Sequence, residues 1–153
     1  MKTLTIPRYT APLGRALFSA IFLWTLPGHF SPESISYAAQ KGVPLASLAV
    51  PLSGLMAFAG GLSILLGYRA RAGAALLVLF LVPVTVMMHD FWTVTDPTAA
   101  ALETAMFVKN VSLIGGALLI LHFGAGPLSL DARQKDQRPE RVRESRLEEP
   151  VAA

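Results

Sequence analysis

The stretch that decides the fold is GVPLASLAVPLSGLMAFAGGLSILLGY, residues 42–68, which lies between Lys41 and Arg69 and contains no charged residue. A second uncharged stretch, AGAALLVLFLVPVTVMMH, occupies residues 72–89. A helix crosses the hydrocarbon core of a bilayer with about 18–20 apolar residues, and each stretch approaches or exceeds that length. Both stretches are therefore predicted to be transmembrane helices.

Two further uncharged runs flank this pair, at residues 16–32 and 110–130. The chain is 53% hydrophobic and only 15% charged, against about 25% charged residues in an ordinary soluble domain. Because hydrocarbon offers the backbone no water to bind, these runs are expected to be helical. The sequence thus predicts an all-α membrane protein, a four-transmembrane-helix bundle with spans near residues 12–28, 46–67, 70–90 and 105–124.

Basic residues predict the orientation of this bundle. Arg15 opens the first span, Arg69 and Arg71 lie in the turn between the second and third, and further basic residues follow the fourth. The positive-inside rule places these segments in the cytoplasm, so both termini are predicted to be cytoplasmic. We expect Arg15, Arg69 and Arg71 to anchor the inner side against the lipid headgroups. Residues 1–11 form a short cytoplasmic segment, 12–131 the membrane domain, and 132–153 a charged tail predicted to be disordered.

Composition excludes several classes of site. The chain contains no cysteine, so it can form neither a disulfide nor a thiolate metal or iron–sulfur site. Its three histidines lack the spacing of a metal motif, and no metal is predicted. Basic and acidic residues alternate in the tail, and no basic face points to a nucleic-acid partner.

Four polar residues are expected to meet near the outer membrane surface. His89 and Asp90 end the third predicted span, while Lys109 and Asn110 lie about one turn inside the outer end of the fourth. Ionisable groups at membrane depth are costly and are candidates for function. We expect a pair between Lys109 and Asp90. The aromatic and imidazole side chains predicted to lie within reach are Trp24, His29 and Trp92.

Such a cluster could bind the polar head of an amphipathic molecule such as a quinone, whose carbonyls accept hydrogen bonds. A structural salt bridge that fixes the bundle explains the same residues equally well. The first hypothesis predicts that Lys109→Leu abolishes protection against unfolding by a quinone.

Several short segments resemble the DoxX family of small bacterial membrane proteins. Residues 107–110, the glycine pair at 115–116 and the exit at 124–131 match its last helix. The resemblance extends over residues 13–131 and includes the segments 13–15, 60–61, 67–71 and 89–92. It implies a four-helix bundle in the bacterial inner membrane and a subunit of a quinone-linked oxidoreductase.

The leading hypothesis is therefore a quinone-interacting or redox-associated membrane subunit, with quinone as the candidate cofactor and a redox protein as partner. The sequence predicts no redox centre within the chain, so electrons would have to come from a bound cofactor or another subunit. A second hypothesis is a non-catalytic scaffold that anchors a partner protein through its inner loop or its tail. A small transporter is a third hypothesis, in which a homo-oligomer could enclose the path.

Overall fold

The computed structural model describes residues 8–134 and 136, and all the regular secondary structure in this part of the chain is helical. The prediction of an all-α protein is therefore confirmed for these residues. The predicted tail, residues 132–153, lies outside them except for 132–134 and 136. The elements in chain order are α1 (Thr10–Trp24), the 3₁₀ helix η1 (Leu26–Phe30), α2 (Pro32–Gln40), α3 (Ala46–Leu66), α4 (Ala70–Met88), the 3₁₀ helix η2 (Phe91–Thr93) and α5 (Pro97–Phe123).

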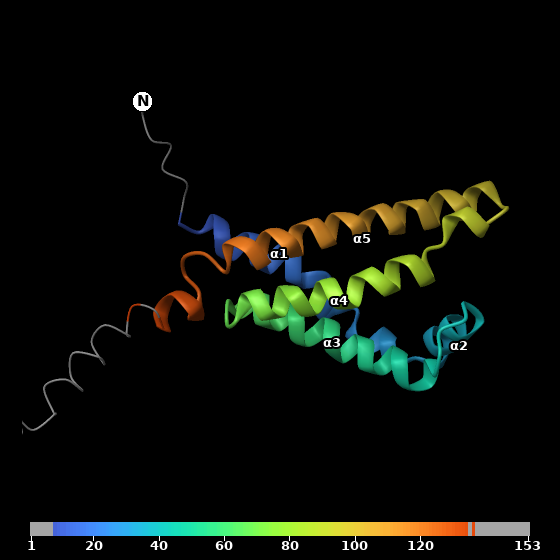
Figure 1. Ribbon diagram of the computed structural model, residues 1–153, viewed down its shortest axis with the longest axis horizontal. Coiled ribbons are helices and arrows are strands. Elements are labelled where there is room, and N and C mark those ends of the chain that lie inside the picture. The colour runs from blue at the N-terminus through green and yellow to red at the C-terminus, as the bar shows by residue number, and fades with distance from the viewer. Residues whose placement is uncertain (1–7, 135, 137–153) are drawn as a thin grey trace, which may run out of the picture.

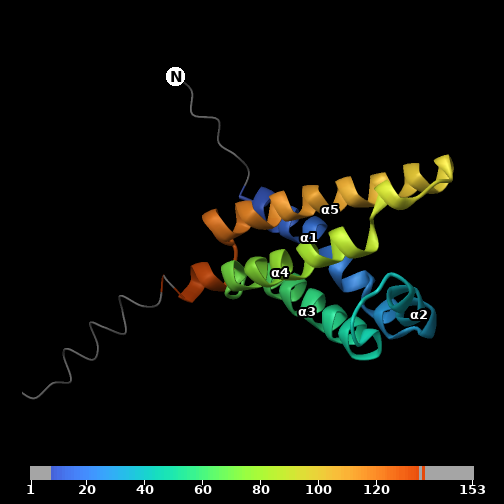
Figure 2. The same cartoon turned by 45° about the vertical axis from the view of Figure 1, so that its right-hand side comes forward.

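Four long helices pack in the order α1, α3, α4 and α5. Figures 1 and 2 show α4 between α3 and α5, with the short α2 beside the beginning of α3. The buried core lies between α1, α3, α4 and α5 and contains Phe22, Ile64, Leu77 and Ala117. Many other leucines and valines of these helices are exposed, as expected for side chains that face lipid.

Helices α3 and α4 approach each other closely at a pair of glycines. A Cβ atom added to Gly60 would lie 2.9 Å from the carbonyl oxygen of Gly73 and 2.8 Å from the Leu77 side chain. Gly73 in turn lies against Ser63 of α3. Small residues at such positions let the backbones touch, which lipid-exposed helices need because no hydrophobic drive brings them together.

Three helical segments of the described chain are long and apolar enough to cross a membrane: Ala46–Leu66, Ala70–Thr93 and Pro97–Phe123. They correspond to the second, third and fourth predicted spans. The predicted first span at 12–28 differs, because α1 ends at Trp24 and the chain continues as η1. Pro27 lies within η1, and a proline cannot donate the backbone hydrogen bond that would continue the α-helix.

The fourth predicted span begins too late. Helix α5 starts at Pro97, eight residues before the predicted residue 105. Its N-terminus is capped by Asp96, whose carboxylate accepts a hydrogen bond from the backbone N–H of Ala99 at 2.7 Å. An aspartate followed by proline is a common start of a helix, and this signal was available in the sequence.

Helix α2 lies where the sequence analysis predicted only a loop. The Ser31 hydroxyl accepts a hydrogen bond from the backbone N–H of Ser34 at 3.2 Å, Pro32 is the first helical residue, and Glu33 lies in the first turn. These are ordinary signals of a helix N-terminus. Helix α2 packs on α3 and η1 and so covers one end of the bundle.

Candidate functional site

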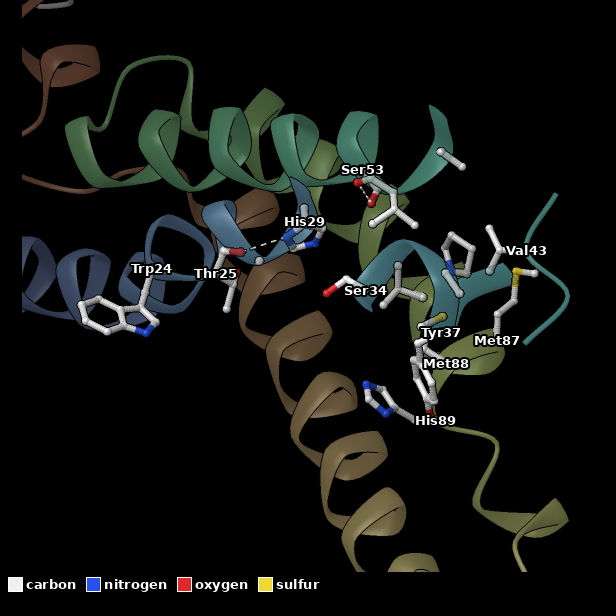
Figure 3. A pocket seen from close by; sticks show the side chains of 16 residues that line it. Trp24, Thr25, His29, Ser34, Tyr37, Val43, Ser53, Met87, Met88 and His89 are labelled. Atoms are coloured by element: carbon white, nitrogen blue, oxygen red, sulfur yellow. Dashed lines mark hydrogen bonds between the residues drawn. The ribbon is translucent and has the colours of Figure 1, made fainter. Parts of the chain in front are cut away.

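A cavity of about 720 Å³ lies at the end of the bundle where α3 begins and α4 ends. Its walls come from the first half of α3, the last turns of α4, η1 and α2 (Figure 3). Most of the lining side chains are apolar, including Val50, Val84 and Met87. The size and the apolar lining are typical of a site for a small organic molecule.

Several polar side chains interrupt this apolar lining, and two of them, Thr25 and Ser53, donate their hydroxyl hydrogens to nearby backbone carbonyls. Ser34, His29 and His89 also line the cavity and are labelled in Figure 3. His29 Nδ1 lies 3.0 Å from the carbonyl oxygen of Thr25, and His89 Nδ1 lies 2.8 Å from Glu103 Oε2. Within residues 8–134, neither Nε2 atom has a hydrogen-bond partner, so both remain available to a ligand.

Side-chain pairs hold the rim of the cavity. Glu103 of α5 contacts both His89 and the Tyr37 hydroxyl, which donates to Glu103 Oε1 at 3.4 Å. Lys41, at the end of α2, forms an ion pair with Asp90. The hydrogen bond to this carboxylate raises the pKa of Lys41 above the ordinary lysine value. The rim thus joins α2, the end of α4 and α5.

The expected pair between Lys109 and Asp90 does not form among the described residues. Asp90 pairs with Lys41, and the Lys109 ammonium has only the sulfur of Met106, at 3.5 Å, as a polar neighbour among the described residues. Lys109 lies six residues beyond Glu103, which is about 9 Å further along the helix. Because α5 begins earlier than predicted, Glu103 rather than Lys109 reaches the level of His89. Asn110 is buried in α5 and does not line the cavity.

The two tryptophans of the predicted cluster have different positions. Trp24 lies at the border of the cavity with 87% of its surface exposed, and it is set apart from the other labelled side chains in Figure 3. Trp92 packs edge-on against Phe91 and Phe107, with ring centroids 5.1 and 5.9 Å away, and does not line the cavity. Only Trp24, His29 and His89 of the predicted set therefore belong to the cavity.

Sequence reasoning missed Lys41, Glu103, Ser34 and Tyr37 as members of this region. The sequence analysis assigned no role to Lys41 or Glu103, which lie between the predicted spans. Recognising the cap at Ser31 would have predicted α2, which carries Ser34 and Tyr37. The pairing of Glu103 with His89 depends on how α4 and α5 pack, for which the sequence gives no spacing signal.

At the opposite end, the predicted role of Arg15 as a lipid anchor is wrong. Arg15 is buried, and its guanidinium donates to the carbonyl oxygens of Ala125, Pro127 (3.3 Å) and Leu128 (2.7 Å). It holds the segment that follows α5. A guanidinium has several donors in a fixed plane and can bind several carbonyls at once.

Arg69 and Arg71 are exposed at the same end. Arg71 donates to the carbonyl oxygen of His122 at 3.0 Å, and the Arg69 guanidinium lies over the Tyr68 ring, 5.7 Å from its centroid. Of the three predicted anchors, these two remain in positions where they can meet another molecule.

Comparison with known proteins fixes the family. The SURF4 family model matches residues 47–137, more than half of the chain. The chain belongs to the SURF4 family. The earlier resemblance to the DoxX family is therefore wrong: its short glycine and charge motifs recur in unrelated membrane helices, because they serve helix packing and orientation.

Relatives of this SURF4-family chain occur in bacteria and yeast. The chain is 32% identical over 100 residues to inner membrane protein YphA of Escherichia coli, covering 65% of this chain and 71% of that protein. It is 33% identical over 95 residues to inner membrane protein YqjF of the same organism, covering 62% and 67%. It is 30% identical over 76 residues to ER-derived vesicles protein ERV29 of Saccharomyces cerevisiae, covering 50% and 24%. No solved structure matches the chain significantly.

These relatives and the apolar helices identify a multi-pass membrane protein of bacterial type. The predicted quinone or oxidoreductase role rested in part on the DoxX resemblance, and neither the family nor the relatives support it.

Proposed function

We propose that this protein binds a membrane-soluble small molecule that carries a hydroxyl group, in the cavity between η1, α2, α3 and α4. The observation that carries the proposal is a largely apolar cavity of about 720 Å³ whose lining includes two imidazoles and the Ser34 hydroxyl. Apolar walls favour a hydrophobic body, and a few polar groups fix the orientation of its head.

Hydrogen bonding at the cavity favours a hydroxyl head. The Thr25 carbonyl and the Glu103 carboxylate can only accept, so Nδ1 of His29 and of His89 carries the hydrogen. In a neutral imidazole, Nε2 is then an acceptor. The Ser34 hydroxyl accepts a hydrogen bond from Ser31 at 3.1 Å, which leaves its own hydrogen for a ligand. A ligand hydroxyl can donate to an imidazole and accept from Ser34.

These hydrogen bonds lead us to expect a quinol in the cavity rather than the quinone expected from the sequence. Quinone carbonyls only accept hydrogen bonds, so they can use the Ser34 hydroxyl but not an imidazole Nε2 atom that is itself an acceptor. A quinol has the same ring and tail but carries hydroxyl groups. The cavity is therefore expected to prefer the quinol of a matched pair, and the proposal includes no electron transfer.

The test compares decylubiquinol with decylubiquinone in thermal unfolding of the detergent-purified full chain. We expect decylubiquinol to raise the unfolding temperature in a saturable manner, because a ligand that binds only the folded state stabilises it. Decylubiquinone should give a smaller rise. Farnesol, an unrelated apolar alcohol, should also stabilise if the hydroxyl decides recognition.

Two matched phenylalanine variants test whether the rise in unfolding temperature comes from binding in the cavity. Ala49→Phe fills the cavity without removing a hydrogen bond and should abolish the rise, whereas Ala105→Phe adds the same ring to an exposed position of α5 and should retain it. Lys109→Leu should also retain it, in contrast to the expectation from sequence. No saturable rise with either alcohol, or equal loss in both phenylalanine variants, would overturn the proposal.

We also propose that α1 together with η1 forms a fourth span and that both termini face the cytoplasm. Fifteen residues of α-helix and five of 3₁₀ helix extend about 32 Å, close to the thickness of the hydrocarbon core, about 30 Å. The concentration of arginines at one end supports the orientation.

The absence of cysteine makes this topology easy to test with single-cysteine variants. Gln40→Cys should react with a membrane-impermeant maleimide in intact spheroplasts. Tyr9→Cys and Tyr68→Cys should react only after permeabilisation. Labelling of Tyr9→Cys and Gln40→Cys from the same side would show that α1 and η1 do not span.

A further inference from the structure

A second cavity, of about 710 Å³, lies at the arginine-rich end of the bundle, away from the site proposed above. It is formed by the turn before α4, the first residues of α4, the end of α5 and the segment that follows α5. Arg69 and Arg71 line it, as do Phe123 and Asp131. Both cations of this lining lie where α4 begins: Arg69 precedes the helix and Arg71 is in its first turn.

Asp131 does not neutralise these two arginines through a side-chain pair. Its carboxylate oxygens accept hydrogen bonds from the backbone N–H groups of Arg69 at 2.7 Å and of Ala70 at 3.1 Å. The carboxylate thus caps the N-terminus of α4, where it satisfies backbone donors that would otherwise lack partners. Within the described residues, neither guanidinium forms a salt bridge.

The hydrogen-bonding capacity of the arginines is largely available. A guanidinium has five N–H donors, and Arg71 uses one nitrogen to bind the His122 carbonyl. That bond fixes the side chain at the end of α5. The Arg69 guanidinium lies over the Tyr68 ring and makes no side-chain hydrogen bond to the described residues, which leaves its donors for a ligand. Two guanidinium groups that line one cavity offer the kind of N–H donors that recognise a phosphate group.

The surroundings of the cavity combine charge with apolar surface. Phe123, the last residue of α5, has 73% of its surface exposed beside the arginines. Helix ends of this kind lie at the level of the lipid headgroups, where basic pockets between transmembrane helices bind anionic lipids. A phospholipid could place its phosphate on the arginines and its acyl chain along Phe123.

We propose that this second cavity binds a phosphate group through Arg69 and Arg71. The structure favours a phospholipid headgroup as its source, and a soluble phosphate offers the same chemistry. The site is independent of the hydroxyl-ligand cavity, and either can fail without the other.

Three probes separate the sources in thermal unfolding of the detergent-purified full chain: phosphatidylglycerol, diacylglycerol with the same acyl chains, and inorganic phosphate. We expect phosphatidylglycerol to stabilise saturably and diacylglycerol, which lacks the phosphate, to have no saturable effect. Stabilisation by inorganic phosphate at similar concentrations would assign the site to a soluble phosphate. Stabilisation by diacylglycerol equal to that by phosphatidylglycerol, or none by any probe, would overturn the proposal.

Charge-matched variants test the residues. Arg69→Gln and Arg71→Gln should each raise the apparent dissociation constant for the phosphate ligand about tenfold, the effect of losing a charge-assisted hydrogen bond. Arg133→Gln removes the same charge from an exposed residue that does not line the cavity and should leave binding within about twofold of the wild type. Arg69→Gln leaves the bond between Arg71 and His122 in place, so a folding defect is not expected to obscure its result. Equal weakening by Arg133→Gln would show general charge attraction and overturn the site.

Discussion

The two ends of the bundle are held together in different ways. At the arginine-rich end, side chains bind backbone groups: Arg15 donates to three carbonyls after α5, and Asp131 accepts from two N–H groups before α4. At the cavity end, the polar contacts that join different helices are between side chains, as in the pairs Lys41–Asp90 and His89–Glu103. The first arrangement fixes chain segments, whereas the second fixes only the tips of side chains.

This difference between the two ends indicates which end of the bundle can open to a ligand. Buried polar backbone groups that lose their partner are costly, so the arginine-rich end is expected to be rigid. A partly exposed ion pair such as Lys41–Asp90 contributes little to stability, and these side-chain pairs can separate without exposing unpaired backbone. The rim of the hydroxyl-ligand cavity is therefore the end that can open.

The largest expected effect is at Arg15. Arg15→Met removes the donor to three carbonyls in a buried setting and should lower the free energy of unfolding by about 3 kcal/mol. Thermal unfolding in detergent measures the change. Leu17→Ala, at an exposed position of the same helix, is the control and should have a much smaller effect. Similar losses in the two variants would show that the carbonyl contacts do not stabilise this end.

A smaller effect is expected at Asp131. Asp131→Ala removes the acceptor for the N-terminus of α4 and should lower stability by about 1 kcal/mol, typical of a lost helix cap. Asp96→Ala removes the cap of α5 at the cavity end and provides the comparison, measured in the same unfolding assay. Asp131 also joins segments distant in sequence, so its loss should exceed that of Asp96; the reverse order would contradict the difference between the ends.

The smallest effect is expected at Lys41. Lys41→Met breaks its pair with Asp90, and unfolding temperatures of variant and wild type should differ slightly and constantly from pH 7 to pH 9. The pKa of Lys41 is raised in the folded state by Asp90. The pair therefore stabilises fully below the ordinary lysine pKa and loses its effect as pH rises through the higher, folded value. A difference that already disappears near pH 8 would show that the pair does not hold the rim.

Much of the helical architecture could be predicted from particular stretches. The uncharged runs at 42–68 and 72–89 gave α3 and α4 nearly to the residue, because a charge is too costly within a lipid-facing helix. Helices α2 and the start of α5 were missed although Ser31–Pro32 and Asp96–Pro97 are ordinary cap signals. Hydropathy alone does not predict helices at the membrane boundary, which are indicated by cap residues instead.

The candidate site was predicted only in part. His29, His89 and Trp24 line the cavity, but Lys109 and Asn110 do not. The start of α5 was predicted eight residues too late, and each residue shifts the level of a side chain by about 1.5 Å along the helix. This error placed Lys109 rather than Glu103 at the level of His89. Short motifs also suggested the wrong family, since glycines and arginines serve packing and orientation in many membrane proteins.

The sequence by itself determined that the chain is helical and made for a membrane, because long uncharged runs have no other stable structure in hydrocarbon. Only the tertiary structure decided which polar groups meet. Arg15 binds carbonyls 110 to 113 residues away rather than lipid, and Asp90 binds Lys41 rather than Lys109. Transmembrane spans follow from local composition. A pair of polar side chains instead depends on how whole helices pack and on their relative level, which every loop and helix cap influences.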